Sequence, residues 1–392
     1  MKKEESRNRK VYLDYAATTP VDPGVLRAMS PYFNRNFANA SSMHSFGQKA
    51  KNALEQSRNI IAEALNAKNE EIIFTSSATE SANLALKGIA FANKNKGNHI
   101  IISSIEHDCV LNTALWLKKQ GFEITQIPVD KYGLVDPKNI KKAIKKETIF
   151  VSVIWANNEI GTVQPIKEIG KICKEKNVLF HTDAAQAFGK IPIDVTKTNI
   201  DLLTASSHKI YGPKGAAFLF VRQGTNLDPI LHGGGQEFGL RSSTENLPAI
   251  VGFAKATQIA IEGMEKENQR LLILRDKIVS QILKEVPDSY LNGHPEKRVP
   301  NITNLRFAFV EGESIMMELD SYGIAVSTGS ACSSPKLEPS HVLLALGLRP
   351  EEIHGSLRIS LGRWTTEDEI NYLLEILPKV IKKLRAISPF AR

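Results

Sequence analysis

Residues 202–209 read Leu-Leu-Thr-Ala-Ser-Ser-His-Lys, and this stretch contains the organising pattern of the fold. An apolar run of strand length, 202–205, ends directly in polar side chains. Similar strand-like runs occur at 72–74, 99–103, 149–155, 178–181 and 216–221. Segments with helical periodicity lie between them, at 48–65, 80–92, 110–119 and 166–176. This alternation predicts βαβ units and a mostly parallel sheet covered on both faces.

The chain has 392 residues, which is longer than one hydrophobic core usually grows, so two domains are expected. Glycines at 233–235 and 239 break the alternation, and 245–285 then has one long helical pattern, interrupted around Pro248 and Gly252. Beyond it, strand patterns at 302–309, 324–327 and 357–361 and helical patterns at 314–319 and 367–384 predict a smaller α+β domain. The expected division is 1–15 as an N-terminal segment joining the small domain, 16–262 as the large domain and 263–392 as the small domain.

Composition narrows the class of protein. The formal charge of +8 is spread over short lysine clusters without interleaved aromatic residues, which favours acidic protein partners or anionic cofactors over nucleic acid. The three cysteines, Cys109, Cys173 and Cys332, form no Cys-x-x-Cys pair, so neither a disulfide framework nor an all-cysteine zinc site is expected. Residues 1–10 are polar, and no apolar stretch reaches membrane-spanning length. These features predict a cytoplasmic protein without a membrane partner.

Polar residues follow each predicted strand, where ligands of open α/β sheets bind. Taken singly, each of them is typical of a helix cap, a turn or a solvated surface pair. The residues are Ser77, Ala78 and Thr79 after 72–74, His107 after 99–103, Asn158 after 149–155, Asp183 and Gln186 after 178–181, and Ser206, His208 and Lys209 after 202–205.

One cofactor, pyridoxal 5'-phosphate (PLP), needs all of these groups together. The turn 77–79 opens a helix and supplies hydroxyls and backbone N–H groups for the phosphate, which Ser206 and His208 complete. Asp183 can keep the pyridine nitrogen protonated, so that the ring acts as an electron sink. Gln186 can reach the phenolic oxygen, and His107 can stack on the ring and transfer protons. Lys209 can form the Schiff base with the aldehyde.

Six segments closely resemble cysteine desulfurases of the NifS/IscS type, which are fold-type I PLP enzymes related to class-V aminotransferases. They are Tyr12-Leu-Asp-Tyr-Ala-Ala-Thr-Thr-Pro20, Ala78-Thr-Glu-Ser81, Glu106-His107, Asn157-Asn-Glu-Ile-Gly161, Ser207-His-Lys-Ile-Tyr-Gly-Pro-Lys-Gly215 and Ser330-Ala-Cys332. The likeness runs in order from about residue 11 to about residue 388. It implies a large domain with a mostly parallel seven-stranded sheet, a smaller α+β domain, and a homodimer with its sites at the subunit interface.

The resemblance also implies an activity, the conversion of L-cysteine to L-alanine with a persulfide left on the enzyme. Carried over by position, Lys209 matches the Schiff-base lysine, His107 the stacking histidine, Asp183 the pyridine partner and Gln186 the phenolic-oxygen ligand. Matches to the phosphate ligands are Ala78, Thr79, Ser206 and His208, with Thr244 donated by the other subunit. Asn158, also a cofactor contact, and Arg358 match groups that hold the substrate, and Cys332 matches the sulfur acceptor.

The three cysteines differ in setting. Cys332 lies in 327–340, a stretch rich in serine and glycine with two prolines, which predicts a mobile loop rather than a core position. Cys109 and Cys173 lie in or beside helical patterns and are predicted to be core residues. Arg358 lies in an alternating strand, where a solvent-facing arginine is the alternative to a carboxylate-binding one.

Some positions depart from the pattern of the family. Ala40 follows Asn39 where the family often has proline, and Phe238 and Ser243 replace a common arginine and glycine beside Thr244. The alternatives are a selenocysteine lyase or another aminotransferase-like PLP enzyme, a scaffold without turnover, and a basic nucleic-acid binder. The resemblance implies an iron–sulfur scaffold or another sulfur-acceptor protein as partner. It implies no resident metal, with Cys332 as a candidate ligand of a transient iron–sulfur cluster shared with the scaffold.

Overall fold

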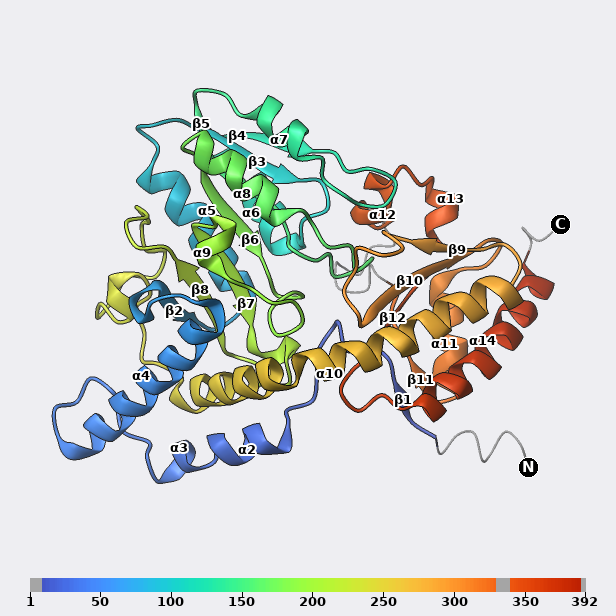
Figure 1. The fold of residues 1–392 in the computed structure, drawn as a ribbon, viewed down its shortest axis with the longest axis horizontal. Coiled ribbons are helices and arrows are strands. Elements are labelled where there is room, and N and C mark those ends of the chain that lie inside the picture. Colours follow the sequence, from blue (N-terminus) through green and yellow to red (C-terminus); the bar gives the residue numbers. More distant parts are fainter. Residues whose placement is uncertain (1–8, 329–338, 389–392) are drawn as a thin grey trace.

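The computed structural model describes residues 9–328 and 339–388, which form two lobes joined by one long helix (Figure 1). This helix, α10 (Leu247–Glu285), adds Phe253 to the core of the larger lobe and Ile278 to the core of the smaller lobe. Each lobe therefore has its own buried core and is described below as a domain. The boundary expected at residue 262 falls inside α10.

The large domain is built on a sheet with the strand order β2-β8-β7-β6-β5-β3-β4. Its strands are β2 (Ile72–Thr75), β3 (His99–Ser103), β4 (Glu123–Ile127), β5 (Thr148–Ser152), β6 (Leu179–Asp183), β7 (Leu202–Ser206) and β8 (Ala217–Val221). All neighbours pair in parallel except at β8, which is antiparallel to β2 and β7. The predicted α/β fold with a mostly parallel seven-stranded sheet is confirmed.

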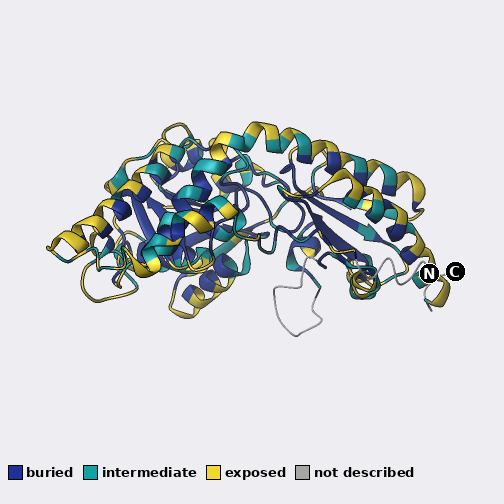
Figure 2. Ribbon diagram, turned by 90° about the horizontal axis from the view of Figure 1, so that it is seen from below, coloured by how far each residue is buried: buried dark blue, intermediate teal, exposed yellow. Residues whose placement is uncertain are grey.

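Helices cover both faces of this sheet. Because successive side chains of a strand point to opposite faces, Ile101 packs in the core beneath α4 (Ser45–Leu65), α8 (Ile166–Glu175) and α10. Ile100 and Ile102 pack on the other face, against α5 (Ala78–Ala92) and α6 (Asp108–Lys119). Figure 2 shows the strands as a buried layer inside a more exposed shell of helices. Double-sided burial explains the continuous apolar runs in the sequence.

Strands β4 and β9 lack the apolar run or alternation that predicts a strand from the sequence. Strand β4 lies at the edge of the large sheet, and most of its side chains are exposed or half-buried, so the run is not apolar. Strand β9 (Ser289–Asn292) is the edge strand of the small sheet, whose order is β12-β10-β9. Both are edge strands, where one side of the backbone and part of the side chains need no buried partner.

The small domain packs helices against this antiparallel sheet of β9, β10 (Ile302–Phe307) and β12 (Ser356–Ser360). The helices are α11 (Gly312–Ser321), α14 (Glu367–Ile387) and the second half of α10. Near the N-terminus, β1 (Val11–Tyr12) pairs in parallel with β11 (Ile324–Ala325). Val11 and Leu13 are buried in the small domain's core.

The interruption expected near Pro248 and Gly252 is absent, because α10 is continuous over 39 residues. Pro248 lies in the first turn, where a missing N–H breaks no intrahelical hydrogen bond. Gly252 permits a close approach to α2 (Pro23–Met29), since a Cβ there would lie 2.6 Å from Met29 Sδ. The two breaker residues therefore mark the start and a packing contact of the helix rather than a break.

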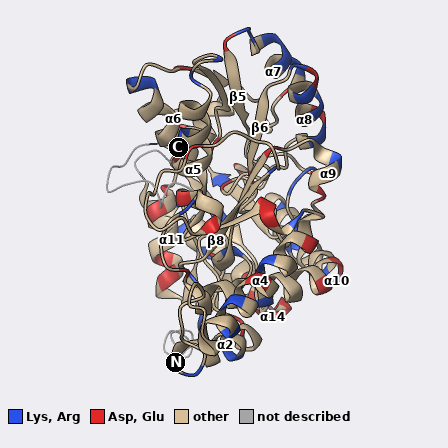
Figure 3. Cartoon of the chain, turned by 90° about the vertical axis from the view of Figure 1, so that its left-hand side faces the viewer, with Lys and Arg blue, Asp and Glu red and all other residues tan. Residues whose placement is uncertain are grey.

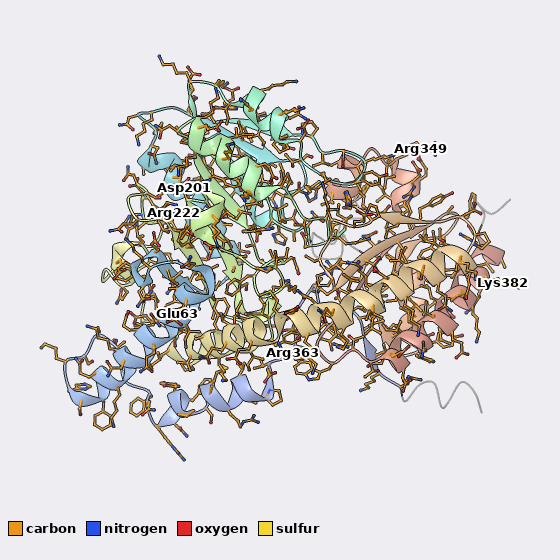
Figure 4. All side chains as sticks on the ribbon, in the orientation of Figure 1. Glu63, Asp201, Arg222, Arg349, Arg363 and Lys382 are labelled. Carbon is orange, nitrogen blue, oxygen red and sulfur yellow. The ribbon has the colours of Figure 1, made fainter. Side chains whose placement is uncertain are left out.

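The remaining elements are short. They are α3 (Pro31–Asn34), α7 (Pro137–Ala143), α9 (Val195–Thr198), α12 (His341–Ala345) and α13 (Pro350–Ile353), with 3-10 turns η1 (Asn69–Glu71), η2 (Ser207–Lys209) and η3 (Glu237–Gly239). Arg363 lies where the two domains meet and pairs with Asp22 at 2.8 Å and Glu267 at 3.0 Å (Figure 4). These ion pairs tie the loop before α14 to α10 and to the cap of α2.

Figure 3 shows lysine and arginine positions, in blue, along α7 and α8, which contain Lys141, Lys142 and Lys174. Neither helix contains an aromatic residue, so this surface lacks the stacking platforms of a single-strand nucleic-acid groove. Within the described residues, no helix combines the length and the apolar character needed to cross a bilayer.

Candidate active site

The predicted site residues gather at the carboxyl edge of the central sheet. Asp183 is the last residue of β6, and Ser206 is the last residue of the neighbouring parallel strand β7. His107 follows the end of β3 and caps α6. A ring nitrogen of His107 and a carboxylate oxygen of Asp183 lie within 4.8 Å of one another. The fold thus brings together His107 and Asp183, which are 76 positions apart in the chain (183 − 107).

Lys209 ends the turn η2 that follows β7. Its Nζ donates hydrogen bonds to the backbone oxygens of Ala16 and Ala17, both at 2.7 Å. Thr19, a few residues on, donates from Oγ1 to the His208 carbonyl at 3.0 Å and accepts from the Tyr211 N–H at 2.9 Å. The segment 12–20, which sequence reasoning quoted without assigning it a role, therefore holds the lysine turn from both sides.

The Asp183 carboxylate is buried, and its Oδ1 accepts a hydrogen bond from the Ala185 N–H at 2.9 Å. Burial raises the pKa of this carboxyl, while the nearby His107 and Lys209 act in the opposite direction. Cationic neighbours therefore favour the ionised form in a setting that otherwise disfavours it. This environment suits a carboxylate that pairs with a buried cation.

His107 is oriented by the residue two positions later. Its Nδ1 accepts from the Cys109 backbone N–H at 3.2 Å and lies 3.1 Å from Cys109 Sγ. Cys109 is buried as predicted, but it also contacts this functional histidine, so a role limited to core packing is incomplete. Burial raises the pKa of the Cys109 thiol well above its ordinary value, which keeps it protonated and makes it a poor metal ligand. Cys173, by contrast, is buried in the large-domain core.

The predicted phosphate ligands lie at or just after the ends of β2 and β7, at the same edge of the sheet. Ala217 of β8 pairs with Thr75 at the end of β2 and with Ser206 at the end of β7. Ser77 caps α5 by accepting from the Glu80 N–H at 3.1 Å, and Ala78 and Thr79 form the first turn of this helix. Backbone N–H groups of a first turn have no intrahelical partner, so they can bind an anion.

His208 lies beside this position, with its Nδ1 3.2 Å from Thr18 Oγ1. Burial, and then the positive charges of Lys209, Lys214 and Lys190, lower its pKa to about 4. His208 is therefore neutral at physiological pH and offers a hydrogen bond to an anion rather than a full charge. Gln186, the predicted phenolic-oxygen ligand, is buried nearby and donates from Nε2 to the Ala16 oxygen at 2.9 Å.

Arg358 of β12 is buried, which excludes the solvent-facing alternative. Its Nη2 donates to Asp14 Oδ1 at 2.8 Å and its Nη1 to the Asn158 backbone oxygen at 3.0 Å, while Nε is buried without a hydrogen-bond partner in the part of the chain that the structure describes. Asn158 thus meets Arg358 through its backbone. The guanidinium joins the small domain to the loop after β5, so it lies at the boundary between the two domains.

Two predicted residues are not placed at the site by the described chain. Thr244 is exposed and follows Ser243, in a segment before α10, so this subunit's own Thr244 is not among the clustered residues. Cys332 lies outside the described residues. The described residues on either side of it are anchored: Ser327 exchanges backbone hydrogen bonds with Arg358, and Ser340 donates to Glu159 Oε2 at 2.6 Å.

Sequence reasoning missed two buried carboxyls at the site, Glu106 and Glu159. Burial raises the pKa of Glu106 to about 8, although Oε1 accepts from Ser103 Oγ and from the Ile154 N–H. Glu106 Oε2 is buried without a partner among the described residues. Burial also raises the pKa of Glu159. The only signal was their position in two of the quoted motifs, next to His107 and Asn158.

A cleft with a volume of about 1140 Å³ lies elsewhere, between the domains. Its lining includes Pro128, Lys190 and Arg298 but none of the predicted site residues. The convergence of chemically suited side chains therefore locates the site better than cavity size does.

The donor set fits PLP. Asp183 Oδ1 accepts from the Ala185 N–H, whereas the contact of Oδ2 among the described residues is the Cys109 thiol at 4.0 Å, the outer limit for a hydrogen bond to sulfur. One buried carboxylate oxygen is thus suited to a pyridinium N–H. A lysine amine, a histidine ring and a helix N-terminus are the other kinds of group that the cofactor needs.

Comparison with known proteins agrees with this chemistry. Residues 11–373 match the family described as Aminotransferase class-V. A protein named Cysteine desulfurase IscS from Methanosarcina thermophila is 53% identical over 384 residues, which cover 98% of this chain and 95% of that protein. Cysteine desulfurase IscS 1 from Archaeoglobus fulgidus is 55% identical over 381 residues, covering 97% of this chain and 99% of its own.

Solved structures give the same picture. A NifS-like protein superposes with a TM-score of 0.91 at 37% identity, covering 96% of this chain and 100% of its own. A structure described as SspA in complex with cysteine has a TM-score of 0.81 at 40% identity and covers 91% of this chain and 100% of its own.

Proposed function

The chain belongs to the class-V aminotransferase family, and from that premise we propose that it is a PLP-dependent cysteine desulfurase, an enzyme that converts L-cysteine to L-alanine and leaves the sulfur on Cys332 as a persulfide. The observation that carries the proposal is the convergence of Lys209, Asp183 and His107 at the carboxyl edge of one sheet. Relatives more than half identical over nearly the whole chain are named cysteine desulfurases. They do not favour a selenocysteine lyase or another aminotransferase-like enzyme.

PLP, when bound, supplies an electron sink for the α-carbon of the substrate. Asp183 would hold its ring nitrogen, Gln186 its phenolic oxygen, and Lys209 its aldehyde carbon. The phosphate would be held by Ala78, Thr79, Ser206 and His208 of the same chain and by Thr244 of a second copy.

Two side chains of this chain handle protons. The Lys209 amine, poised beside the Ala16 and Ala17 carbonyls, takes the α-proton of cysteine once substrate has displaced it. His107 Nδ1 is an acceptor of the Cys109 N–H, so in the neutral ring the proton is on Nε2, from which it can be passed on.

Arg358 would bind the carboxylate of cysteine. Its guanidinium is already oriented by Asp14 and by the Asn158 carbonyl, and no residue of the described ranges 9–328 and 339–388 accepts from its Nε. A planar guanidinium can bind a carboxylate through two parallel hydrogen bonds, which fixes the orientation of the amino acid as well as its charge.

The sulfur step needs no external oxidant. The Cys332 thiolate attacks the substrate sulfur, the carbon–sulfur bond of cysteine breaks, and an S–S bond forms on the enzyme. The carbon fragment keeps the bonding electron pair and takes a proton to become alanine. Only the thiolate is nucleophilic, so deprotonation of Cys332 precedes the attack.

The proposal includes a homodimer. Phe37, Met43 and Phe46, in and around the start of α4, have exposed fractions of 69%, 93% and 59%, and such a group of large apolar side chains is typical of a protein interface. A second copy would cover it and would bring its Thr244 to the site. An iron–sulfur scaffold or another sulfur-acceptor protein is the proposed partner, and the small number of cysteines supports a cytoplasmic location.

The test separates binding from sulfur transfer. C332S should still bind cysteine, as seen by a change in the visible spectrum of the bound cofactor, but should produce almost no alanine. Mass spectrometry of wild-type enzyme after brief exposure to cysteine should find one added sulfur on the peptide containing Cys332. C173A, at a core position, serves as the control and should retain alanine production. Normal alanine production by C332S would overturn the proposal.

A further inference from the structure

Lys190 lies one turn beyond Gln186 in the segment that follows β6. Backbone hydrogen bonds at 2.9 and 2.8 Å from residues 190 and 191 to the Ala187 oxygen wind this segment into consecutive turns. Gly189 has a φ of 72°, and a Cβ there would lie 2.9 Å from Ile210 Cγ2, so the segment packs tightly against the turn after Lys209. The geometry places Gln186 and Lys190 on the same side of the turn.

The two side chains are in contact. Lys190 Nζ lies 3.2 Å from Gln186 Oε1 and 3.5 Å from the Gln186 backbone oxygen. The backbone oxygen of Lys190 accepts from Asn268 Nδ2 of α10 at 2.7 Å, which fixes the position of the residue. Lys190 is half-buried and lines the cleft between the domains, so one end of it faces the cleft and the other faces the site.

These contacts define the orientation of the Gln186 amide. The backbone oxygen of Ala16 can only accept, so the Ala16 side must meet Nε2, and Oε1 then faces Lys190 Nζ, which donates to it. The Ala16 oxygen also accepts from Lys209 Nζ, so the Gln186 amide and the Lys209 amine share one backbone acceptor. The second N–H of Gln186 Nε2 is then the donor left for a ligand in the site.

We propose that Lys190 is a positioning residue, which holds the Gln186 amide with its Nε2 N–H available to the phenolic oxygen of PLP and so lowers the proton affinity of the cofactor-bound Lys209 nitrogen. This inference rests on the proposed function for the identity of the cofactor. A hydrogen bond donated to the phenolate withdraws negative charge from the oxygen next to that nitrogen, which weakens its hold on a proton.

The charge of Lys190 is a competing explanation that the test must separate. Burial and the neighbouring Lys209 lower the pKa of Lys190 to about 7, and Glu267 opposes this shift. Lys190 therefore carries only part of a charge near neutral pH. A direct effect of that charge on Lys209 would not depend on Gln186, whereas an effect transmitted by the amide requires it.

The experiment is a double-mutant cycle on the holoenzyme, read as the pH at which the visible absorbance band of the bound cofactor titrates. K190M should move this pH upward by about one unit, a tenfold change in proton affinity. Q186L should move it in the same direction. In the Q186L background, K190M should cause no further shift. K174M, at an exposed lysine of α8, is the matched control and should leave the titration unchanged.

Equal shifts from K190M in both backgrounds would overturn the inference and assign the effect to charge alone, and no shift from K190M would overturn it as well. If the methionine variant does not fold, K190A is measured in the same way. The readout is independent of turnover: a wild-type protein without a visible band would contradict the proposed function, whereas a normal band with additive shifts contradicts only the role of Lys190.

Discussion

The cofactor side of the site and the side that borders Cys332 are built from different kinds of contact. On the cofactor side, Asp183 is the last residue of β6 and Lys209 follows β7. Asp183 accepts from a backbone N–H, and Lys209 donates to backbone oxygens. On the other side, Ser340 and His341 reach from the small domain to Glu159 and to the Glu106 carbonyl at 2.6 and 2.8 Å. The first set depends on the sheet, whereas the second depends on contacts across the domain boundary, where Val342 and Leu343 also pack with Ile105 in one buried apolar cluster.

This difference separates two kinds of function. A cofactor must stay in register with its acid, base and ring partner, so rigid strand ends suit it. A group that accepts sulfur and passes it on must serve two positions, so a place outside the rigid strand ends suits it. Substitutions on the cofactor side should therefore remove chemistry, and substitutions on the Cys332 side should leave cofactor binding intact.

The largest effect is expected at Lys209. K209A removes the amine that binds the cofactor covalently and takes the α-proton, so turnover should fall by at least ~10³-fold. Borohydride reduction of the wild-type enzyme followed by peptide mapping should place the pyridoxyl group on Lys209. Label on the nearby Lys214 would contradict the assignment, and K214A serves as the control that should keep the label.

Asp183 comes next on the cofactor side. D183N keeps the shape of the side chain but not its negative charge, so the ring nitrogen loses its proton partner and turnover should fall by about 10²-fold. Some cofactor should remain bound, because the other contacts are unchanged. Turnover and the absorbance of bound PLP, measured together, test this separation. Near wild-type turnover would show that Asp183 has no such role.

Local sequence patterns predicted which polar residues gather at the sheet edge, because a polar residue after an apolar strand has a defined place there. They did not predict Asp14 or the Ala16 carbonyl as partners of Arg358 and Lys209. Those contacts join residues about 190 or more positions apart, and no local periodicity encodes them. Edge strand β4 was missed since its side chains are largely exposed. Pro248 was misjudged because a proline in a first turn resembles a break.

Arg358 lies between the two sides and should give an intermediate effect. R358K keeps the charge but loses the planar pair of donors, so the KM for cysteine should rise roughly tenfold, equal to about 1.4 kcal/mol, with a smaller change in kcat. Steady-state kinetics with cysteine measure both constants. The exposed Arg349 provides the control R349K, which should leave both unchanged. An unaltered KM in R358K would exclude Arg358 from substrate binding.

The smallest effect is expected at Ser340, on the Cys332 side. S340A removes the hydroxyl that donates to buried Glu159, which costs about 1–3 kcal/mol of local anchoring, while cofactor binding and the KM for cysteine should not change. Alanine formation should fall only a few-fold, because the end of the segment that bears Cys332 is positioned less well.

The same substitution has a pH signature. Burial raises the pKa of Glu159, and the Ser340 hydroxyl opposes that shift by stabilising the ionised carboxylate, so S340A should raise the pKa further. The free energy of unfolding of S340A should show only a small deficit at acidic pH, where Glu159 is protonated in both proteins, because the variant still loses the Ser340 cap of α12, which accepts from the Leu343 N–H at 3.2 Å. The deficit should grow as pH rises above the ordinary glutamate range, where the wild-type carboxylate ionises with its donor and the variant ionises without one. Denaturant unfolding at several pH values measures this difference, with S280A, an exposed serine of α10, as the control. A deficit that stays constant with pH would mean that Ser340 acts only through its cap of α12 and its packing, and the hydrogen bond to Glu159 would then not be what anchors the Cys332 side.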